Sequence, residues 1–163
     1  MTDRSGFDEF VRARGPALAR TAYLLTGDHH LAEDLVQAAL VQAAKHWERI
    51  ETSPEAYARR TMYHQNISWW RRRRLAESPL ESYDAPVPAS DPTLRLTLEQ
   101  ALRRLTPRQR TVLVLRYFED LTEVQTAAAL GISSGAVKSM SRQALQRLRV
   151  LAPELADLVG ADA

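Results

Sequence analysis

The sequence predicts an all-α protein, with two small helical domains joined by a proline-rich linker. Apolar residues recur at three- and four-residue spacing through nearly every segment, which is typical of amphipathic helices. No stretch has the strict alternation that indicates a half-buried strand. The composition changes between Ser78 and Thr93, a segment that contains half of the chain's 8 prolines and lacks a helical stripe.

The length of the chain agrees with this division, since 163 residues are enough for two small domains. We expect a first domain over residues 1–77, a linker over 78–93, a second domain over 94–152 and a short tail over 153–163. An extended proline-rich linker of this length spans on the order of 50 Å. That length corresponds to roughly fifteen base pairs of DNA. Two domains joined in this way could reach sites on one duplex that lie more than a helical turn apart.

Helix-breaking and capping residues indicate where the first two helices of the first domain begin and end. The first helix is expected to begin near Phe7, and Gly15-Pro16 is expected to interrupt it before it continues. Gly27 is suited to end that helix, because glycine adopts left-handed backbone angles readily. Asp28 is suited to cap the helix that follows.

A third helix is predicted from Ser53-Pro54 to about Arg73, because a capping hydroxyl followed by proline is typical of a helix start. Its end, Asn66–Arg74, combines two of the chain's 3 tryptophans with a run of arginines. Aromatic faces can stack on unpaired bases while arginines follow the phosphates. The alternative is that one tryptophan belongs to the core and the arginines form a solvated helix end.

The second domain contains the strongest local signal, a helix-turn-helix between Thr122 and Leu148. Thr106 and Thr122 each begin a capping box, with glutamine three residues later. Gly131 can supply the left-handed turn, and Ser133 can cap the longer second helix. Such a pair presents its second helix to the major groove of DNA.

Charge supports a nucleic-acid role for this domain. The whole chain has a net charge of only +2, so the position of the charge matters more than its sum. Between Leu98 and Ala152, nine basic residues face four acids, which gives a net charge of +5. The alternative is an ordinary helical hairpin with a solvated basic face.

Several other classes of site are not expected. The chain has no cysteine, which excludes disulfides and thiolate sites. His30 and Glu33 have the spacing of metal ligands on a helix, but no second pair accompanies them, so we expect no metal site. There is no glycine-rich phosphate loop and no convincing nucleophile–base pair, so we expect neither a cofactor nor an enzyme. Without a signal peptide or a long apolar run, we expect a cytoplasmic protein that does not insert into a membrane.

Taken together, these motifs resemble the extracytoplasmic-function sigma factors of bacteria, over a stretch from about Phe7 to Arg149. Gly6-Phe7, the segment Tyr23–Asp28 and the tandem tryptophans are most similar to an actinobacterial subgroup labelled SigE-like. The segment Leu31–Gln37 is similar to conserved region 2.2, which docks on a coiled coil of the polymerase's largest subunit. The resemblance therefore implies core RNA polymerase as a partner. The implied docking residues are Leu31, Asp34, Leu35 and Gln37.

The segment Pro54–Arg74 resembles regions 2.3 and 2.4, which melt and read the promoter's −10 element. The resemblance implies that residues there bind DNA. They are Arg60, Tyr63, Asn66, Trp69, Trp70, Arg71, Arg72 and Arg73.

The segment Leu105–Thr122 resembles region 4.1, and Leu130–Arg149 resembles region 4.2, which reads the −35 element. The polymerase flap is a further implied contact. The implied DNA-binding residues are Arg108, Ser134, Lys138, Ser139 and Arg142. Many relatives carry more arginine where this chain has Met140 and Ser141, so its preferred upstream sequence cannot be copied from a relative.

The predicted function is that of a sigma factor that directs core RNA polymerase to specific promoters. Promoter DNA is then the second partner, and an anti-sigma factor remains open as a third. The alternative is a stand-alone helix-turn-helix repressor or activator, which normally binds a two-fold site as a dimer. A helical adaptor that binds only proteins is a further alternative, against which the basic second domain argues.

Overall fold

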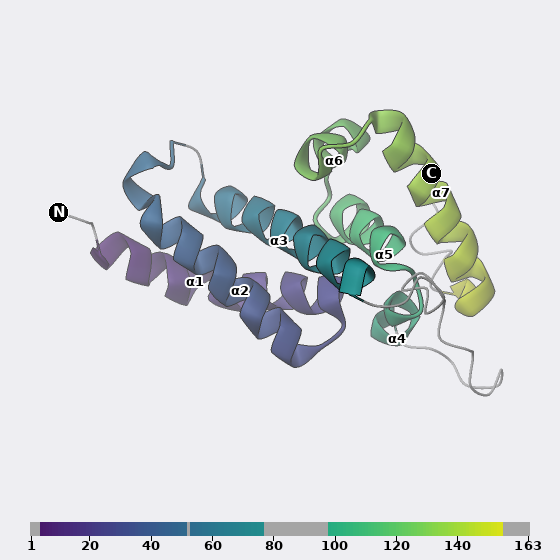
Figure 1. Ribbon diagram of the computed structural model, residues 1–163, viewed down its shortest axis with the longest axis horizontal. Helices are drawn as coiled ribbons and strands as arrows, with labels where there is room; N and C mark the ends of the chain where they lie inside the picture. Colours follow the sequence, from purple (N-terminus) through teal and green to yellow (C-terminus); the bar gives the residue numbers. More distant parts are fainter. Residues whose placement is uncertain (1–3, 52, 77–97, 155–163) are drawn as a thin grey trace. The chain divides into compact units, whose positions relative to one another are not determined.

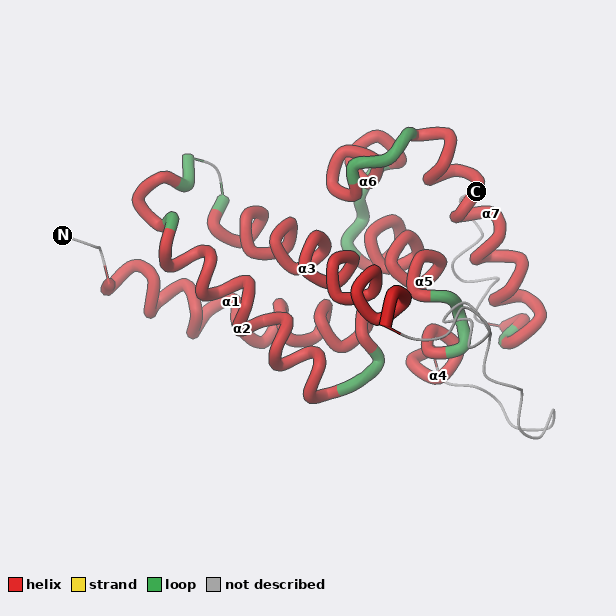
Figure 2. The backbone as a smooth tube through the Cα atoms, in the orientation of Figure 1, coloured by secondary structure: helices red, strands yellow, loops and turns green. Residues whose placement is uncertain are grey.

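The computed structural model describes residues 4–51, 53–76 and 98–154, and it describes the side chains of the third helix only as far as Arg72. The chain divides into two compact units, unit 1 over residues 1–71 and unit 2 over 72–163. Figure 2 shows helices connected by loops, and the described residues contain no strand. The expected all-α class is confirmed. The predicted linker, 78–93, and most of the predicted tail lie outside the described residues.

The described part of unit 1 contains two long helices, most of a third and one short turn of helix (Figure 1). In chain order they are α1 (Arg4–Thr26), α2 (His29–Lys45), the 3-10 turn η1 (Trp47–Arg49) and α3 (Pro54–Ala76). Helices α1 and α2 pack against one another. The fully buried side chains of the unit include Leu18, Leu35 and Met62, one from each long helix. Burial of these apolar faces stabilises the unit more than helix propensity does.

Helix α1 runs through Pro16 without a break, so the predicted interruption at Gly15-Pro16 is wrong. Proline removes one backbone hydrogen bond from a helix interior. Here, aromatic and apolar contacts lie on both sides of it. Phe7 and Phe10 lie 5.5 and 5.6 Å from the Trp47 ring before the proline, and Leu18 is fully buried after it. Tertiary packing therefore overrides the local signal.

The helix ends of unit 1 follow the predicted caps. Gly27 has a φ of 69°, which is the left-handed angle expected where α1 ends. The Asp28 carboxylate accepts a hydrogen bond from the Leu31 amide at 3.0 Å and caps α2. The Ser53 hydroxyl accepts from the Ala56 amide at 3.3 Å and caps α3.

The described part of unit 2 consists of short helices followed by one long helix. In chain order they are α4 (Leu98–Arg103), α5 (Pro107–Leu113), the π-helical turn η2 (Val114–Phe118), α6 (Glu123–Leu130) and α7 (Ser134–Leu151). Helix α7 packs against α4, α5 and α6. Both predicted capping boxes are present. Thr106 and Gln109 cap α5, and Thr122 and Gln125 cap α6, each with reciprocal hydrogen bonds.

The connection from η2 to α6 is a tight turn held by its own backbone and one arginine. The Glu119 amide donates to the Val114 carbonyl at 2.9 Å, one residue further back than in an α-helix. Asp120 takes a left-handed φ of 56°. The Arg116 guanidinium then donates to the Leu121 carbonyl at 2.6 Å, which fixes the direction in which α6 begins.

The turn between α6 and α7 confirms the predicted helix-turn-helix. Gly131 has a φ of 68°, and the Ser133 hydroxyl accepts from the Ala136 amide at 3.1 Å. Inside the corner, Val112, Ala127 and Val137 form a buried cluster, against which Ile132 packs. The two helices of the motif are therefore held by a cap, a glycine and a small core.

Candidate nucleic-acid interface

Helix α3 carries an exposed basic stripe along one face. Arg60, His64 and Arg71 are exposed, and their spacing places them on the same side of the helix. At 1.5 Å of rise per residue, Arg60 and Arg71 are about 16 Å apart along the helix axis. Arg72, also predicted to bind DNA, is exposed at the border of this stripe. The stripe can follow a nucleic-acid backbone over several phosphates.

His64 was not among the predicted DNA-binding residues, although it lies between Arg60 and Arg71 on this stripe. The spacing i, i+4, i+11 could have identified it, because these positions share a helix face. Its side chain adds a hydrogen-bonding imidazole to a surface that is otherwise made of guanidinium groups.

The aromatic residues predicted to bind DNA occupy different environments. Trp69 and Asn66 are half-buried, on the side of α3 away from the basic stripe. Tyr63 and Trp70 are buried, at 4% and 6% exposure, so neither presents an open face for base stacking in this structure. Their predicted contacts with DNA therefore stay predictions. Adjacent tryptophans on a helix face different sides, and Trp70 is the more buried of the two.

Arg73 belongs to the last turns of α3, where the structure describes the helix but not the side chains. Its predicted DNA contact therefore lies outside the described side chains.

Helix α7 presents a polar face at its amino-terminal half. Its inner face is apolar, since Val137, Leu145 and Leu148 are buried as predicted. The outer positions nearest the turn are exposed. They are Ser134, Lys138, Ser139 and Arg142, with Gln143 beside them. These side chains offer donors suited to phosphates and to base edges in a major groove.

Arg108, the remaining residue predicted for this element, is exposed in the first turn of α5, one residue after Pro107. The capping box at Thr106 fixes the start of this helix. Arg108 therefore projects from a rigid helix start, on a different helix from the four α7 side chains.

Helix α2 carries a separate outer face of mixed character. Asp34 and Gln37 are exposed and three residues apart, so they share this face, and Leu31 is half-buried beside them. Leu35, predicted to contact the polymerase, is instead fully buried in unit 1. Its prediction as a docking residue is corrected, because a side chain without exposed surface cannot touch a partner unless the core opens.

The outer face of α2 also includes Val41, which sequence reasoning missed. Val41 is 47% exposed, an unusual position for a large apolar side chain, and it lies one turn beyond Gln37. The repeated i, i+3, i+7 spacing from Asp34 could have identified it. Leu31 and Val41 are apolar side chains that flank the Asp34 carboxylate and the Gln37 amide on this face.

Within the described part of the chain, no group of three or more histidine, aspartate or glutamate side chains is arranged to hold a metal ion. No helix there combines the length and the apolar character needed to cross a membrane.

Two family models and several relatives show which family this chain is similar to. The model described as "Sigma-70 region 2" matches residues 10–76, and "Sigma-70, region 4" matches residues 101–150. The RNA polymerase sigma-E factor of Streptomyces coelicolor is 44% identical over 149 residues, which cover 88% of this chain and 84% of that protein. The ECF RNA polymerase sigma factor SigE of Mycolicibacterium smegmatis is 32% identical over 88% of this chain and 60% of its own length.

A solved structure has a similar fold. The sigma factor RpoE of Bartonella quintana, in complex with the anti-sigma factor NepR, gives a TM-score of 0.67 at 25% identity, over 90% of this chain and 96% of that one. The two matched regions correspond to the helices described in unit 1 and to the helix-turn-helix of unit 2. The chain therefore belongs to the sigma-70 family of RNA polymerase sigma factors, within its extracytoplasmic-function group.

Proposed function

We propose that this sigma factor directs core RNA polymerase to specific promoters through three separate surfaces. The outer face of α2 docks on the polymerase, α3 opens and reads the −10 element, and α7 reads the −35 element. The observation that carries the proposal is the outer face of α7, where four donor side chains project from a helix that a cap and a left-handed glycine hold in place.

At the −35 element, the amino-terminal half of α7 enters the major groove. Lys138 and Arg142 are one turn apart and are suited to phosphates or to guanine. Ser134 and Ser139 can donate to or accept from base edges. Arg108, at the start of α5, adds a phosphate contact outside the groove. The polymerase flap remains the proposed protein contact of this unit.

At the −10 element, some side chains of α3 contact the phosphates and others contact the unpaired bases. Arg60, Arg71 and Arg72 follow the phosphates, and Asn66 reads an unpaired base. Extruding a base costs a few kcal/mol. Stacking on Trp69 offsets this by about 1–3 kcal/mol. Contacts of Tyr63 and Trp70 with DNA would require the segments that cover them to move, since both side chains are buried in this structure.

On the polymerase side, Asp34 and Gln37 supply the polar contacts and Leu31 and Val41 supply the apolar border. A partner helix with basic and apolar side chains matches this composition. We further propose that the chain acts in the cytoplasm, catalyses no reaction itself, and uses residues 78–93 as the linker between its domains. An anti-sigma factor is a proposed third partner, since RpoE of Bartonella quintana was solved with one.

Reconstitution tests the proposal as a whole. The purified chain is mixed with core RNA polymerase, and transcription is measured from fragments of genomic DNA. A sigma factor gives promoter-specific transcripts that need both components. Specific DNA binding by the chain alone, as a dimer and without dependence on the polymerase, would instead support a stand-alone repressor.

Asp34→Ala is expected to weaken binding to core polymerase by about 1–3 kcal/mol, or roughly 5- to 150-fold, because a charge at the interface loses its partner. Thermal unfolding should not change, since Asp34 is exposed. Glu33→Ala is the matched control: it removes the adjacent exposed acid from a different helix face. Equal binding by both variants in a pull-down contradicts the docking role.

Lys138→Ala is expected to weaken holoenzyme binding to −35 DNA and to reduce the slope of log K against log salt by about 1, as the loss of one phosphate contact does. Arg149→Ala is the control, because it removes the same charge from an exposed site about 16 Å further along α7. The same salt dependence for both variants contradicts a local contact by Lys138.

A further inference from the structure

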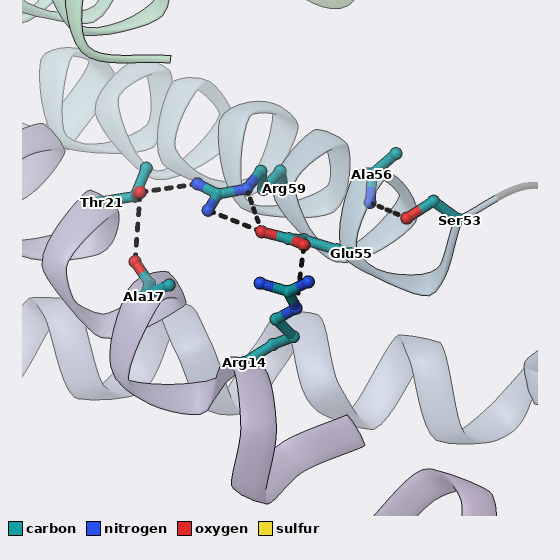
Figure 3. Close-up of polar contacts among 7 residues, drawn as sticks. All are labelled: Arg14, Ala17, Thr21, Ser53, Glu55, Ala56 and Arg59. Atoms are coloured by element: carbon teal, nitrogen blue, oxygen red, sulfur yellow. Dashed lines mark hydrogen bonds and ion pairs between the residues drawn. The ribbon is translucent and has the colours of Figure 1, made fainter. Parts of the chain in front are cut away.

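The proposed function gives docking and DNA binding to different helices of unit 1, so the relative position of these helices matters. Helix α2 faces the polymerase and α3 faces the DNA. Helix α1 packs against α2. A polar network then joins α1 to the first two turns of α3 (Figure 3).

The network centres on Arg59 of α3. Its Nε and Nη2 atoms donate to the Glu55 carboxylate at 3.2 and 2.9 Å, one helical turn earlier. Its Nη1 atom donates to the Thr21 hydroxyl of α1 at 2.7 Å. The Thr21 hydroxyl in turn donates to the Ala17 carbonyl at 3.2 Å. One guanidinium group therefore binds both helices at the same time, and its planar shape fixes their geometry.

A second, weaker link closes the network from α1. The Arg14 Nε atom lies 3.3 Å from the other carboxylate oxygen of Glu55. The Arg14 side chain is 57% exposed, whereas those of Arg59 and Glu55 are 19% and 25% exposed. Exposed ion pairs contribute little because solvent and salt screen them. The Arg59–Thr21 contact is therefore the stronger link between the helices, since Thr21 is also buried at 4% exposure.

The network lies at one end of α3 and the proposed DNA contacts lie towards the other. Helix α3 runs continuously from Pro54 to Ala76. Asn66 and Trp69 are about 10 and 15 Å from Arg59 along its axis. A small rotation of α3 about its first turn displaces Asn66 and Trp69 more than it displaces residues near Arg59. Side chains at functional sites must be held within about 0.5 Å of their working positions.

We infer that Arg59 is a positioning residue: through Thr21 and Glu55 it sets α3 on α1, and so determines how the DNA-facing side chains meet the promoter while α2 is held by the polymerase. The inference rests on the proposed function. It concerns the geometry of promoter opening, and Arg59 itself touches neither DNA nor polymerase.

Substitutions at Thr21 separate hydrogen bonding from packing. Thr21→Val keeps the shape of the side chain but removes the acceptor for Arg59, whereas Thr21→Ser keeps the hydroxyl and removes a methyl group. Each full-length variant is combined with core polymerase. Two quantities are measured: the affinity for the core, and the rate of promoter opening, from the fluorescence of 2-aminopurine placed in the −10 element.

Thr21→Val is expected to slow opening by roughly three- to tenfold, while core affinity stays within about twofold. Thr21→Ser is expected to open the promoter at nearly the unsubstituted rate. The inference is overturned if Thr21→Val opens normally, if Thr21→Ser is as slow as Thr21→Val, or if core affinity falls as much as opening does. Should Thr21→Val fail to fold, Arg59→Lys makes the same test, because one ammonium group lacks the fork that binds Glu55 and Thr21 together.

Two more variants separate this inference from the proposed function. Arg14→Gln removes only the exposed link and should change opening by less than about twofold. Trp69→Ala should slow opening strongly if α3 melts DNA. Normal opening by Trp69→Ala contradicts the role proposed for α3. Slow opening by Trp69→Ala together with normal opening by Thr21→Val contradicts only the positioning role of Arg59.

Discussion

Both units have local helix caps, but unit 1 also joins its long helices through side chains far apart in sequence. In unit 2, the start of each helix in the helix-turn-helix is fixed by a hydroxyl cap within three residues of it, at Thr122 and Ser133, and the turn is fixed by Gly131. In unit 1, the long helices are joined by side chains far apart in sequence. Arg59 and Thr21 are 38 residues apart, and the Tyr57 hydroxyl lies 3.2 Å from the Nδ1 atom of His46, 11 residues earlier.

The unfolding of the two units can be followed with different spectroscopic signals. All 3 tryptophans, Trp47, Trp69 and Trp70, belong to unit 1. Tryptophan fluorescence therefore follows the unfolding of unit 1, whereas far-ultraviolet circular dichroism follows the helices of both units. Substitutions can then be assigned to the unit that they destabilise.

The largest expected effect is on unit 1, from Leu35→Ala. The Leu35 side chain is fully buried in the core, so its truncation should lower the free energy of unfolding by about 2–5 kcal/mol. The fluorescence transition in urea should move to lower concentration. Leu31→Ala, at a half-buried site one turn earlier, should cost clearly less. Equal costs would mean that Leu35 is not the core residue of α2.

A smaller effect is expected on unit 2 from Gly131→Ala. A Cβ atom at Gly131 meets nothing within 4 Å, so the cost is conformational and amounts to about 1–2 kcal/mol at a φ of 68°. The circular dichroism transition should shift and the fluorescence transition should not.

The same substitution four residues later is a matched control for Gly131. Gly135 lies inside α7 and its added Cβ would meet only the Ser133 hydroxyl, at 3.9 Å. Gly135→Ala should therefore stabilise unit 2, by up to about 1 kcal/mol. Destabilisation by both substitutions would show that the backbone angle is not what matters at Gly131.

The smallest effect, with the opposite sign, is expected from Thr126→Val. Thr126 is fully buried in α6, and its hydroxyl has no hydrogen-bond partner in the part of the chain that the structure describes. Replacing it with an isosteric methyl group should raise the stability of unit 2 by about 1 kcal/mol. Thr111→Val is the control, since the Thr111 hydroxyl donates to the Pro107 carbonyl at 2.7 Å and its loss should be unfavourable.

The same contrast explains which features the sequence could predict. Caps and turns depend on residues within four positions of one another, so the sequence alone is enough to identify Asp28, Thr106 and Gly131. It is not enough to predict the continuity of α1 through Pro16, because this depends on Trp47 packing against the preceding turns.

The candidate sites follow the same rule. Periodicity places Lys138 and Arg142 outside, because the apolar face of α7 is regular. It could not decide which of Trp69 and Trp70 is the more buried, nor that Leu35 is core. Helix periodicity predicts which residues share a face, but not which segments cover that face. No sequence pattern predicted the contact between Arg59 and Thr21.

A footprint of the reconstituted holoenzyme on a promoter selected from genomic fragments tests the central claim most directly. If one helical unit opens DNA and the other anchors in a groove, the chain with core polymerase should protect both the −35 and the −10 elements. Thymines near the −10 element should also become reactive to permanganate. Protection of a single two-fold site by the chain alone, unchanged by polymerase and without reactive thymines, would contradict the account.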